Sequence, residues 1–346
     1  MSVLTFRSSE YETFPPIMKE YARYQHVIKG NSEKTVCEYL LDVRTFFRYL
    51  KSRNEGTIPD KQEFEKISIS DITLADTEKI RQDDILEYMM FARSERENSS
   101  TTRMRKLSAI RSFYNYLCNK KHYFEHNPTV DIDSPKPAKT LPKYMTYEES
   151  LRLLETVRND VDSPTNTRDF AIIVLFLNTG MRLSELVGLN LQSFSSDLGT
   201  VRVIGKGNKE RMIYLNDFAK SAIGEYLRVR LDPKYIRTSD KAFFLSSREQ
   251  RISAKTVQWM VSKYLTMAGL GHKGLSVHKL RHTAATLMYQ TGKVDIRVLK
   301  EVLGHEQLNT TQIYTHVVDR NLEQAVERNP LADVKLKRPK LSDEVK

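Results

Sequence analysis

Cysteine is scarce in this chain, with only two among 346 residues. Cys37 and Cys118 both fall within helix-like patterns, where a cysteine is typically a small core residue. A disulfide framework requires several cysteine pairs, and a zinc site built from cysteines requires a cluster of them. The cysteine content therefore excludes both kinds of stabilisation.

Long apolar runs are missing as well. No segment approaches the ~20 apolar residues that a membrane helix needs, and the first residues contain no apolar segment of the signal-peptide type. We therefore expect a soluble, intracellular protein. The net charge of +11 and the pI of about 9.4 predict a polyanionic partner. Charge alone does not decide between nucleic acid and an anionic membrane.

Motifs for bound metals and nucleotides are incomplete. His305-Glu306 begins a zinc-protease pattern, but position 309 does not supply the second histidine. His278 and His282 are four residues apart and could share a metal, yet no carboxylate ligand motif accompanies them. Gly292-Lys293 lacks the earlier glycine of a nucleotide-binding loop. We therefore expect chemistry that uses no cofactor and no metal.

The first 126 residues predict a domain of four helices. The first helix covers 14 to about 29, and Asn31-Ser32 offers an N-cap for the second. The third covers about 82–95, and the polar run 99–102 caps the fourth. Apolar residues recur at helical spacing in the second and fourth: Val36, Leu40, Val43, Phe47, Leu50, Met104, Leu107, Ile110, Tyr114 and Leu117. Residues 52–80 predict a loop with a short extended or helical piece and receive no function.

Basic residues are concentrated on the predicted fourth helix. We expect them on its surface, where they can contact phosphates. A solvated charged face is the alternative explanation for such a run. The candidates for DNA contact are Arg103, Arg105, Lys106 and Arg111, together with Lys209 further along the chain.

A proline-rich segment at 127–145 predicts an extended linker, because proline cannot continue a helix. It separates a first domain, 1–126, from a second, 146–346. Two domains joined in this way can close around a bound partner as a clamp. The second domain opens on a capping box formed by Thr146 and Glu149.

The second domain combines helices with one β-hairpin. An apolar run, 171–177, leads to Gly180, a typical helix stop. Strands at 201–204 and 211–215 flank a glycine-rich turn. Helices at about 217–230 and 254–267 complete the frame. The expected fold class is mainly α with a small β-hairpin, in a two-domain clamp.

Four residues of this second half suggest a site that handles a phosphodiester. Its transition state gathers negative charge on the non-bridging oxygens, and a planar guanidinium can clamp two of them at once. Arg281 and Arg182 are the candidate clamps, and His278 lies one helical turn before Arg281. Tyr314 would supply the attacking oxygen, once nearby cations favour its ionised form.

Two further donors complete the set. Lys206, in the hairpin turn, can protonate the leaving 5′ hydroxyl. His305 follows a glycine and could orient the phosphate or the phenol. Each histidine or tyrosine taken singly is more simply a packed or surface residue. Only their combination indicates catalysis.

The motifs that carry these residues resemble those of the tyrosine recombinases, closest to the Xer type. They are TGMRLSEL at 179–186, GKGNKER at 205–211, HKLRHT at 278–283, LGH at 303–305 and TTQIYTH at 310–316. The resemblance covers about 146–314. It implies that Tyr314 is the nucleophile and that five residues activate the phosphate: Arg182, Lys206, His278, Arg281 and His305.

The resemblance also implies a fold, a reaction and partners. The four-helix domain resembles the SAM-like core-binding domain of these enzymes, on the strength of LSAIRSFY at 107–114. The implied activity is site-specific recombination, in which strands are cleaved and rejoined through a 3′-phosphotyrosyl intermediate and a Holliday junction. The implied partner is double-stranded DNA with paired half-sites. A homotetramer, or a heterotetramer with a related recombinase, would bind it.

The region beyond Tyr314 predicts one more short helix. Leu322, Ala325 and Val326 form its apolar face, and a helix this short needs a partner surface. The resemblance implies docking into a neighbouring protomer, and docking on its own domain is the alternative. Residues 335–346 predict a disordered charged tail.

Two other functions stay open. A type IB topoisomerase would use much the same chemistry to relax DNA, although a terminal helix suited to exchange argues against it. A DNA-binding protein with vestigial chemistry is disfavoured, because no catalytic position is substituted. Among recombinases, both the resolution of chromosome or plasmid dimers and the integration or excision of a mobile element fit the sequence. We expect a cytoplasmic, nucleoid-associated enzyme.

Overall fold

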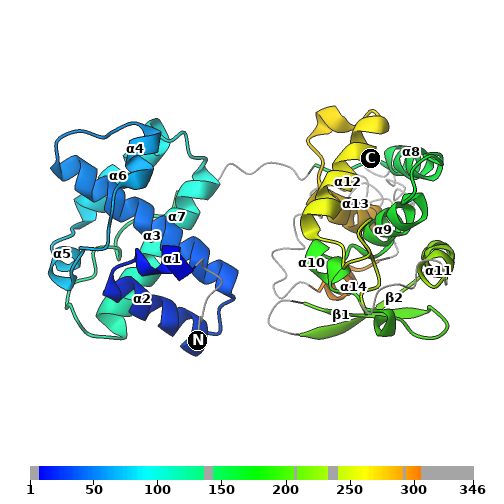
Figure 1. The fold of residues 1–346 in the computed structure, drawn as a ribbon, viewed down its shortest axis with the longest axis horizontal. Helices are drawn as coiled ribbons and strands as arrows, with labels where there is room; N and C mark the ends of the chain where they lie inside the picture. The colour runs from blue at the N-terminus through cyan, green and yellow to red at the C-terminus, as the bar shows by residue number, and fades with distance from the viewer. Residues whose placement is uncertain (1–7, 136–142, 206–208, 233–240, 291–293, 305–346) are drawn as a thin grey trace, which may run out of the picture. The chain divides into compact units, whose positions relative to one another are not determined.

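The computed structural model describes residues 8–135, 143–205, 209–232, 241–290 and 294–304. The chain divides into two units, Met1–Lys139 and Thr140–Lys346 (Figure 1). Regular structure in the described residues is helical apart from one two-stranded sheet. The predicted fold class, mainly α with a small β-hairpin in two domains, is confirmed. Among the described helices, none is both long and apolar enough to cross a membrane.

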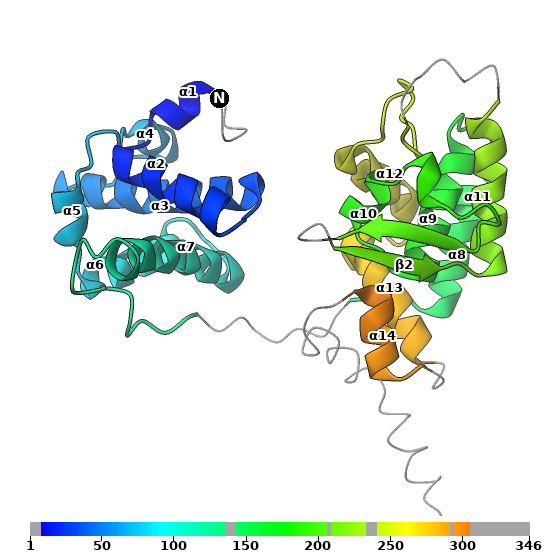
Figure 2. The same ribbon diagram turned by 90° about the horizontal axis from the view of Figure 1, so that it is seen from below.

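The first unit is built around two long helices, α3 and α7, which run side by side (Figure 2). They bury aromatic side chains such as Phe46, Phe47 and Phe113, each at most 1% exposed. Its elements are α1 (Ser8–Glu12), α2 (Pro16–Arg23), the π-helix η1 (Tyr24–Ile28), α3 (Glu33–Asn54), α4 (Lys61–Lys66), α5 (Leu74–Glu78), α6 (Gln82–Ser94) and α7 (Ser100–Asn119).

Local signals set the ends of these helices. The Ser32 side chain accepts from the Thr35 backbone N–H and caps α3, and Ser99 caps α7 through Thr102. The segment predicted as the first α-helix, 14–29, is not α-helical in its last part. α2 starts with Pro16 in its first turn and gives way after Arg23 to the π-helix η1. The predicted helix is therefore two elements of different hydrogen-bond pattern.

Residues 52–80 contain more helix than the sequence predicts, since both α4 and α5 lie in this segment. Asp60 caps α4 by accepting from two backbone N–H groups, and Thr73 and Asp76 form a capping box on α5. Phe64, on α4, is 1% exposed and joins the core of the first unit. This segment thus forms part of the first unit's fold.

Residues at both ends of the predicted linker, 127–145, are buried. Ile132 is 5% exposed and packs in the core of the first unit, so this unit continues past the predicted boundary at 126. At the other end, Met145 is buried, and its backbone N–H donates to Thr283 Oγ1 at 3.0 Å. Both ends of the predicted linker therefore pack against a unit, and residues 136–142 lie outside the described ones.

The second unit surrounds one buried helix, α9, which packs against α8, α11 and α13. Residues 170–177 of α9 are buried on every side. The elements are α8 (Tyr147–Arg158), α9 (Asn166–Thr179), α10 (Leu183–Val187), the 3-10 helix η2 (Leu191–Ser193), β1 (Thr200–Ile204), β2 (Glu210–Tyr214), α11 (Asp217–Arg230), α12 (Ala254–Met267), the 3-10 helix η4 (Gly271–Lys273), α13 (Val277–Gln290) and α14 (Ile296–Leu303).

The hairpin and α14 are the two parts of this unit that matter most for the site. Strands β1 and β2 pair antiparallel, with Val201 opposite Ile213, and both side chains are buried on the inner face. Helix α14 packs through a cluster of its own, in which Leu299 and Leu303 contact Ala285 of α13. Figure 2 shows α14 beside α13.

Candidate active site

A left-handed glycine places Arg182. Gly180 ends α9 with φ of 61°, a conformation that glycine adopts without steric penalty. A Cβ at this position would lie 2.8 Å from Leu303 Cδ2. The chain therefore turns in close contact with the end of α14, and Arg182 follows as the N-cap of α10.

Arg182 and Arg281 meet at the C-terminal end of α14. Arg281, on α13, is 3% exposed, and it donates to Gly180 O at 2.5 Å and to Leu303 O at 2.6 Å. Arg182 donates from Nη2 to Gly304 O at 2.8 Å. Because Leu303 and Gly304 are consecutive, the two guanidinium groups lie at adjacent carbonyl oxygens. The two predicted clamps are thus neighbours.

His278 stands one turn before Arg281 on α13. Burial lowers the pKa of His278, and the charges of Lys279, Arg281 and Arg182 lower it further. The imidazole is therefore neutral near pH 7 and can donate one hydrogen bond. Its ring packs edge-to-face on His282, with ring centroids 4.6 Å apart. Among the described residues, no group of three or more histidine, cysteine or acidic side chains could hold a metal ion.

Glu185 is a site residue that the sequence reasoning missed. Its carboxylate is fully buried and accepts from the Arg182 backbone N–H at 2.7 Å and from Arg182 Nη1 at 3.0 Å. Arg211 on β2 donates to both carboxylate oxygens, at 2.6 and 3.1 Å. Burial alone would raise the pKa of Glu185, but the hydrogen bonds from these two arginines hold it below its usual value.

Sequence signals for these two residues do exist. Glu185 stands three residues after the N-cap Arg182, which is the spacing of a capping box. Arg211 has the same strand parity as Ile213 and is therefore expected to face inward. Neither signal predicts that Arg211 and Glu185 pair with each other.

Three of the predicted catalytic residues, Lys206, His305 and Tyr314, lie outside the described residues. The structure describes the neighbours of two of them. Gly205 donates its backbone N–H to Lys209 O at 2.8 Å and closes the described part of the hairpin. Gly304, at φ of 63°, ends α14.

The predicted basic face of α7 needs a correction. Lys106 is 9% exposed, and its Nζ lies 3.1 Å from Oδ1 of Asp42, a buried residue of α3. Arg105 donates to the other oxygen of Asp42 at 2.5 Å and to Glu38 at 3.2 Å. Because Asp42 needs cationic partners inside the unit, Lys106 turns inward and is not part of an open basic face.

The remaining DNA-contact candidates differ in setting. Arg111 donates to Ser134 Oγ at 2.6 Å and to the Ile132 carbonyl, so it fastens the segment after α7. Arg103 is half-buried, and its Nε has no hydrogen-bond partner among the described residues. Lys209, beside the hairpin turn, is exposed.

The Asp42 cluster leads to a stability prediction. Asp42→Ala should destabilise the first unit by about 3 kcal/mol, because it leaves the Lys106 ammonium buried without its partner. Urea unfolding of the full chain measures the loss. Asp71→Ala is the matched control, since the Asp71 carboxylate is 67% exposed in its pair with Lys51, and it should cost ~0.5 kcal/mol or less. Equal losses in the two variants would contradict the prediction.

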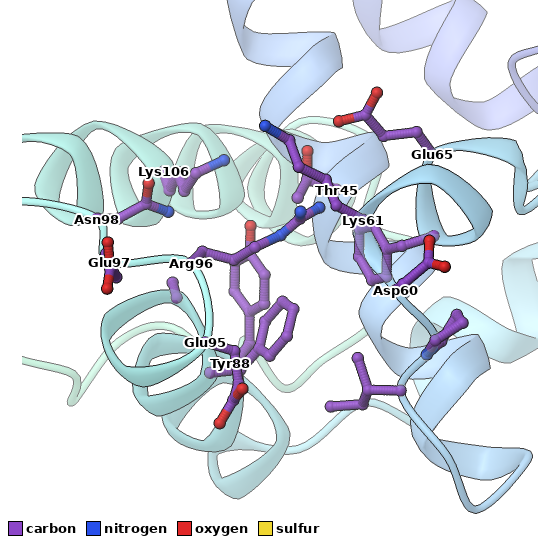
Figure 3. A pocket seen from close by; sticks show the side chains of 15 residues that line it. Thr45, Asp60, Lys61, Glu65, Tyr88, Glu95, Arg96, Glu97, Asn98 and Lys106 are labelled. Carbon is purple, nitrogen blue, oxygen red and sulfur yellow. The ribbon is translucent and has the colours of Figure 1, made fainter.

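The first unit contains a pocket of about 710 Å³ (Figure 3). Tyr88 lines it, and within the described part of the chain its buried hydroxyl has no hydrogen-bond partner. Arg96 stacks over the Phe64 ring, 4.4 Å from its centroid. Because three cations and four carboxylates line the pocket together, its charge favours neither an anion nor a cation.

Comparison with known proteins bears directly on this site. The model of the Phage integrase family matches residues 143–321. A tyrosine recombinase XerC from Caldanaerobacter subterraneus subsp. tengcongensis is 48% identical over 319 residues, which cover 92% of this chain and 88% of the relative.

Two solved structures share the fold. One is an XerH site-specific recombinase bound to difH substrate, with a TM-score of 0.66, 22% identity, and coverage of 90% of this chain and 83% of that one. The other is a lambda integrase tetramer bound to a Holliday junction, with a TM-score of 0.60, 16% identity, and coverage of 86% and 76%. Family match and close relative together carry the assignment: the chain belongs to the phage integrase family, as a tyrosine recombinase of the Xer type and hence an enzyme of site-specific DNA recombination.

Proposed function

We propose that Tyr314 attacks the scissile phosphate of one DNA strand within this family's reaction. The phenolate oxygen forms a bond to phosphorus, the bond to the 5′ oxygen breaks, and a 3′-phosphotyrosyl link results. Lys206 gives its proton to the leaving 5′ oxygen. The phosphotyrosyl link keeps the bond energy, so a 5′ hydroxyl of a second strand can reverse the step without a nucleotide or a metal.

The observation that carries this proposal is the meeting of Arg182 and Arg281 at Leu303 O and Gly304 O. Two guanidinium groups at adjacent positions can clamp both non-bridging oxygens of one phosphate as its negative charge grows. Neutral His278, on the same side of α13 as Arg281, would add a hydrogen bond without changing the charge. The first residue beyond Gly304 is His305, which would extend the same cluster.

The proposed partner is double-stranded DNA with paired half-sites. We propose a tetramer of this chain, or of this chain with a related recombinase, that exchanges strands through a Holliday junction. A lambda integrase of the same fold forms a tetramer on such a junction, which supports this assembly. The basic composition, with a net charge of +11, supports a nucleic-acid partner.

For the biological role, we propose resolution of chromosome or plasmid dimers in the cytoplasm, at the nucleoid. The 48% identity to an XerC recombinase favours this role over integration or excision of a mobile element. Release of a monomer from a plasmid that carries two directly repeated sites tests it. Relaxation of a supercoiled plasmid that has no recombination site would favour the topoisomerase alternative.

Covalent capture tests the chemistry. A duplex nicked close to the cleavage site loses a short fragment after attack, so the phosphotyrosyl link cannot reverse. Wild-type protein should form an adduct that survives denaturing electrophoresis, in the presence of excess chelator. A metal requirement, or no adduct on any candidate site, would refute the proposal.

Lys206→Ala should slow cleavage of ordinary DNA, by about 10² or more, because the leaving 5′ oxygen then departs without a proton. A substrate with sulfur at this 5′ position needs no proton, since a thiolate leaves readily. Single-turnover rates on the two substrates measure the effect. The sulfur substrate should restore most of the rate, and equal defects on both would contradict the general-acid role.

A further inference from the structure

Arg211 lies on the inner face of the hairpin, where its neighbours are apolar. The register pairs Val203 with Arg211 and Val201 with Ile213, so all four side chains share one face. The three apolar side chains are at most 5% exposed, and the side chain of Arg211 is 17% exposed. A guanidinium in such a place is unfavourable unless a buried anion pairs with it.

The buried anion is Glu185. Two donors of Arg211 face its two carboxylate oxygens, at 2.6 and 3.1 Å, in the fork geometry that arginine favours. The same two oxygens accept from the backbone and the side chain of Arg182, at 2.7 and 3.0 Å. One carboxylate therefore holds two arginines, one on β2 and one in the proposed phosphate clamp.

Arg211 also packs against the backbone that Arg182 binds. A Cβ at Gly304 would lie 2.6 Å from Arg211 Nη1 and 2.9 Å from its Cζ, so any side chain there would displace the guanidinium from its present position. Gly304 O is the acceptor for Arg182 Nη2. Arg211 thus contacts both groups that fix Arg182, the Glu185 carboxylate and the Gly304 backbone.

The charges explain why a second arginine is needed. Glu185 orients Arg182, but a buried carboxylate alone would cancel the positive charge that the clamp offers to a phosphate. A second cation on the same carboxylate offsets that loss, and Arg211 is so placed. Its role differs from that of a clamp, since its terminal donors are turned to Glu185.

We propose that Arg211 is a positioning residue for strand cleavage, which neutralises and holds Glu185 so that Arg182 is oriented and keeps its charge for the phosphate. The proposal rests on the function proposed above. It predicts that the defect of an Arg211 variant depends on the negative charge of Glu185.

The test is the single-turnover rate of covalent capture on the nicked duplex. Arg211→Met should lower the rate about 30-fold, with affinity for the duplex within about threefold of wild type. Arg211→Lys keeps the positive charge but loses the two-donor fork, so its rate should fall about fivefold, between wild type and Arg211→Met. Adding Glu185→Gln to Arg211→Met should recover about tenfold over the single variant, because the amide no longer cancels Arg182.

Arg202→Met is the matched control. Arg202 lies on the outer face of β1, with a 55% exposed side chain, and its loss should leave the rate within about twofold. Thermal melting identifies a variant that fails to fold. If Arg211→Met does not fold, the rates of Arg211→Lys and of the double variant, each compared with wild type, decide.

The outcomes separate the two proposals. If the wild-type chain forms no adduct through Tyr314, the proposed function fails. If the wild-type chain does form it, a rate for folded Arg211→Met within threefold of wild type overturns the role of Arg211. A double variant no faster than the single variant, or Arg211→Lys as slow as Arg211→Met, overturns it as well.

Discussion

Tyr314→Phe is expected to abolish covalent capture of DNA, while affinity for the duplex stays within about twofold of wild type. The substitution keeps the aromatic ring and removes only the oxygen that would bond to phosphorus. No other oxygen of the side chain can take its place. Denaturing electrophoresis of the nicked duplex reports the adduct, and a gel-shift titration at fixed salt reports binding.

Tyr214→Phe is the control for this variant. Tyr214, at the end of β2, is 84% exposed, and removing its hydroxyl should leave capture unchanged. An adduct formed by Tyr314→Phe would show that another residue is the nucleophile. Loss of capture in both variants would mean that the assay does not isolate the nucleophile.

Changing either Arg182 or Arg281 to alanine should slow cleavage by about 10² or more. Each guanidinium is expected to stabilise charge that develops only in the transition state, so the rate should fall more than the affinity for DNA. Single-turnover cleavage at saturating protein measures this rate. Arg228→Ala, on the exposed side of α11, removes one positive charge elsewhere in the same unit and should cleave at the wild-type rate.

The two variants differ in their effect on the fold. Arg281 is 3% exposed and holds Gly180 O and Leu303 O, so its removal also leaves buried carbonyl groups unpaired. Arg182 is more exposed, at 34% for its side chain. We therefore expect a lower melting temperature for Arg281→Ala than for Arg182→Ala. Wild-type cleavage by either folded variant would remove that residue from the clamp.

Much of the fold follows from signals within a few residues. The capping box of Thr146 and Glu149 opens α8, and Gly180 ends α9, as predicted. Helices α11 and α12 have the predicted bounds, 217–230 and 254–267. These ends depend on hydrogen bonds between neighbours in sequence, which is why the sequence alone predicts them.

Features that depend on distant partners were harder to predict. The helical pattern places Lys106 on the surface of α7. In the structure its side chain is instead buried and pairs with Asp42 on α3, 64 positions away. Glu185 and Arg211 form an ion pair although they are 26 positions apart in sequence. The local pattern around either residue does not predict this partner. The proposed catalytic residues are a different case. Their motifs predict the residue types and their order, but only the fold shows that Arg182 and Arg281 are neighbours.

The separate packing of α14 has a consequence for the mobility of Arg182 and Arg281. Leu299 and Leu303 anchor this helix in a small cluster with Ala285, apart from the large core. Helices with few buried contacts shift at a small fraction of the global unfolding free energy. Since Arg182 and Arg281 both donate to carbonyl oxygens at the C-terminal end of α14, a small shift of this helix would change a hydrogen bond of each guanidinium group at the same time.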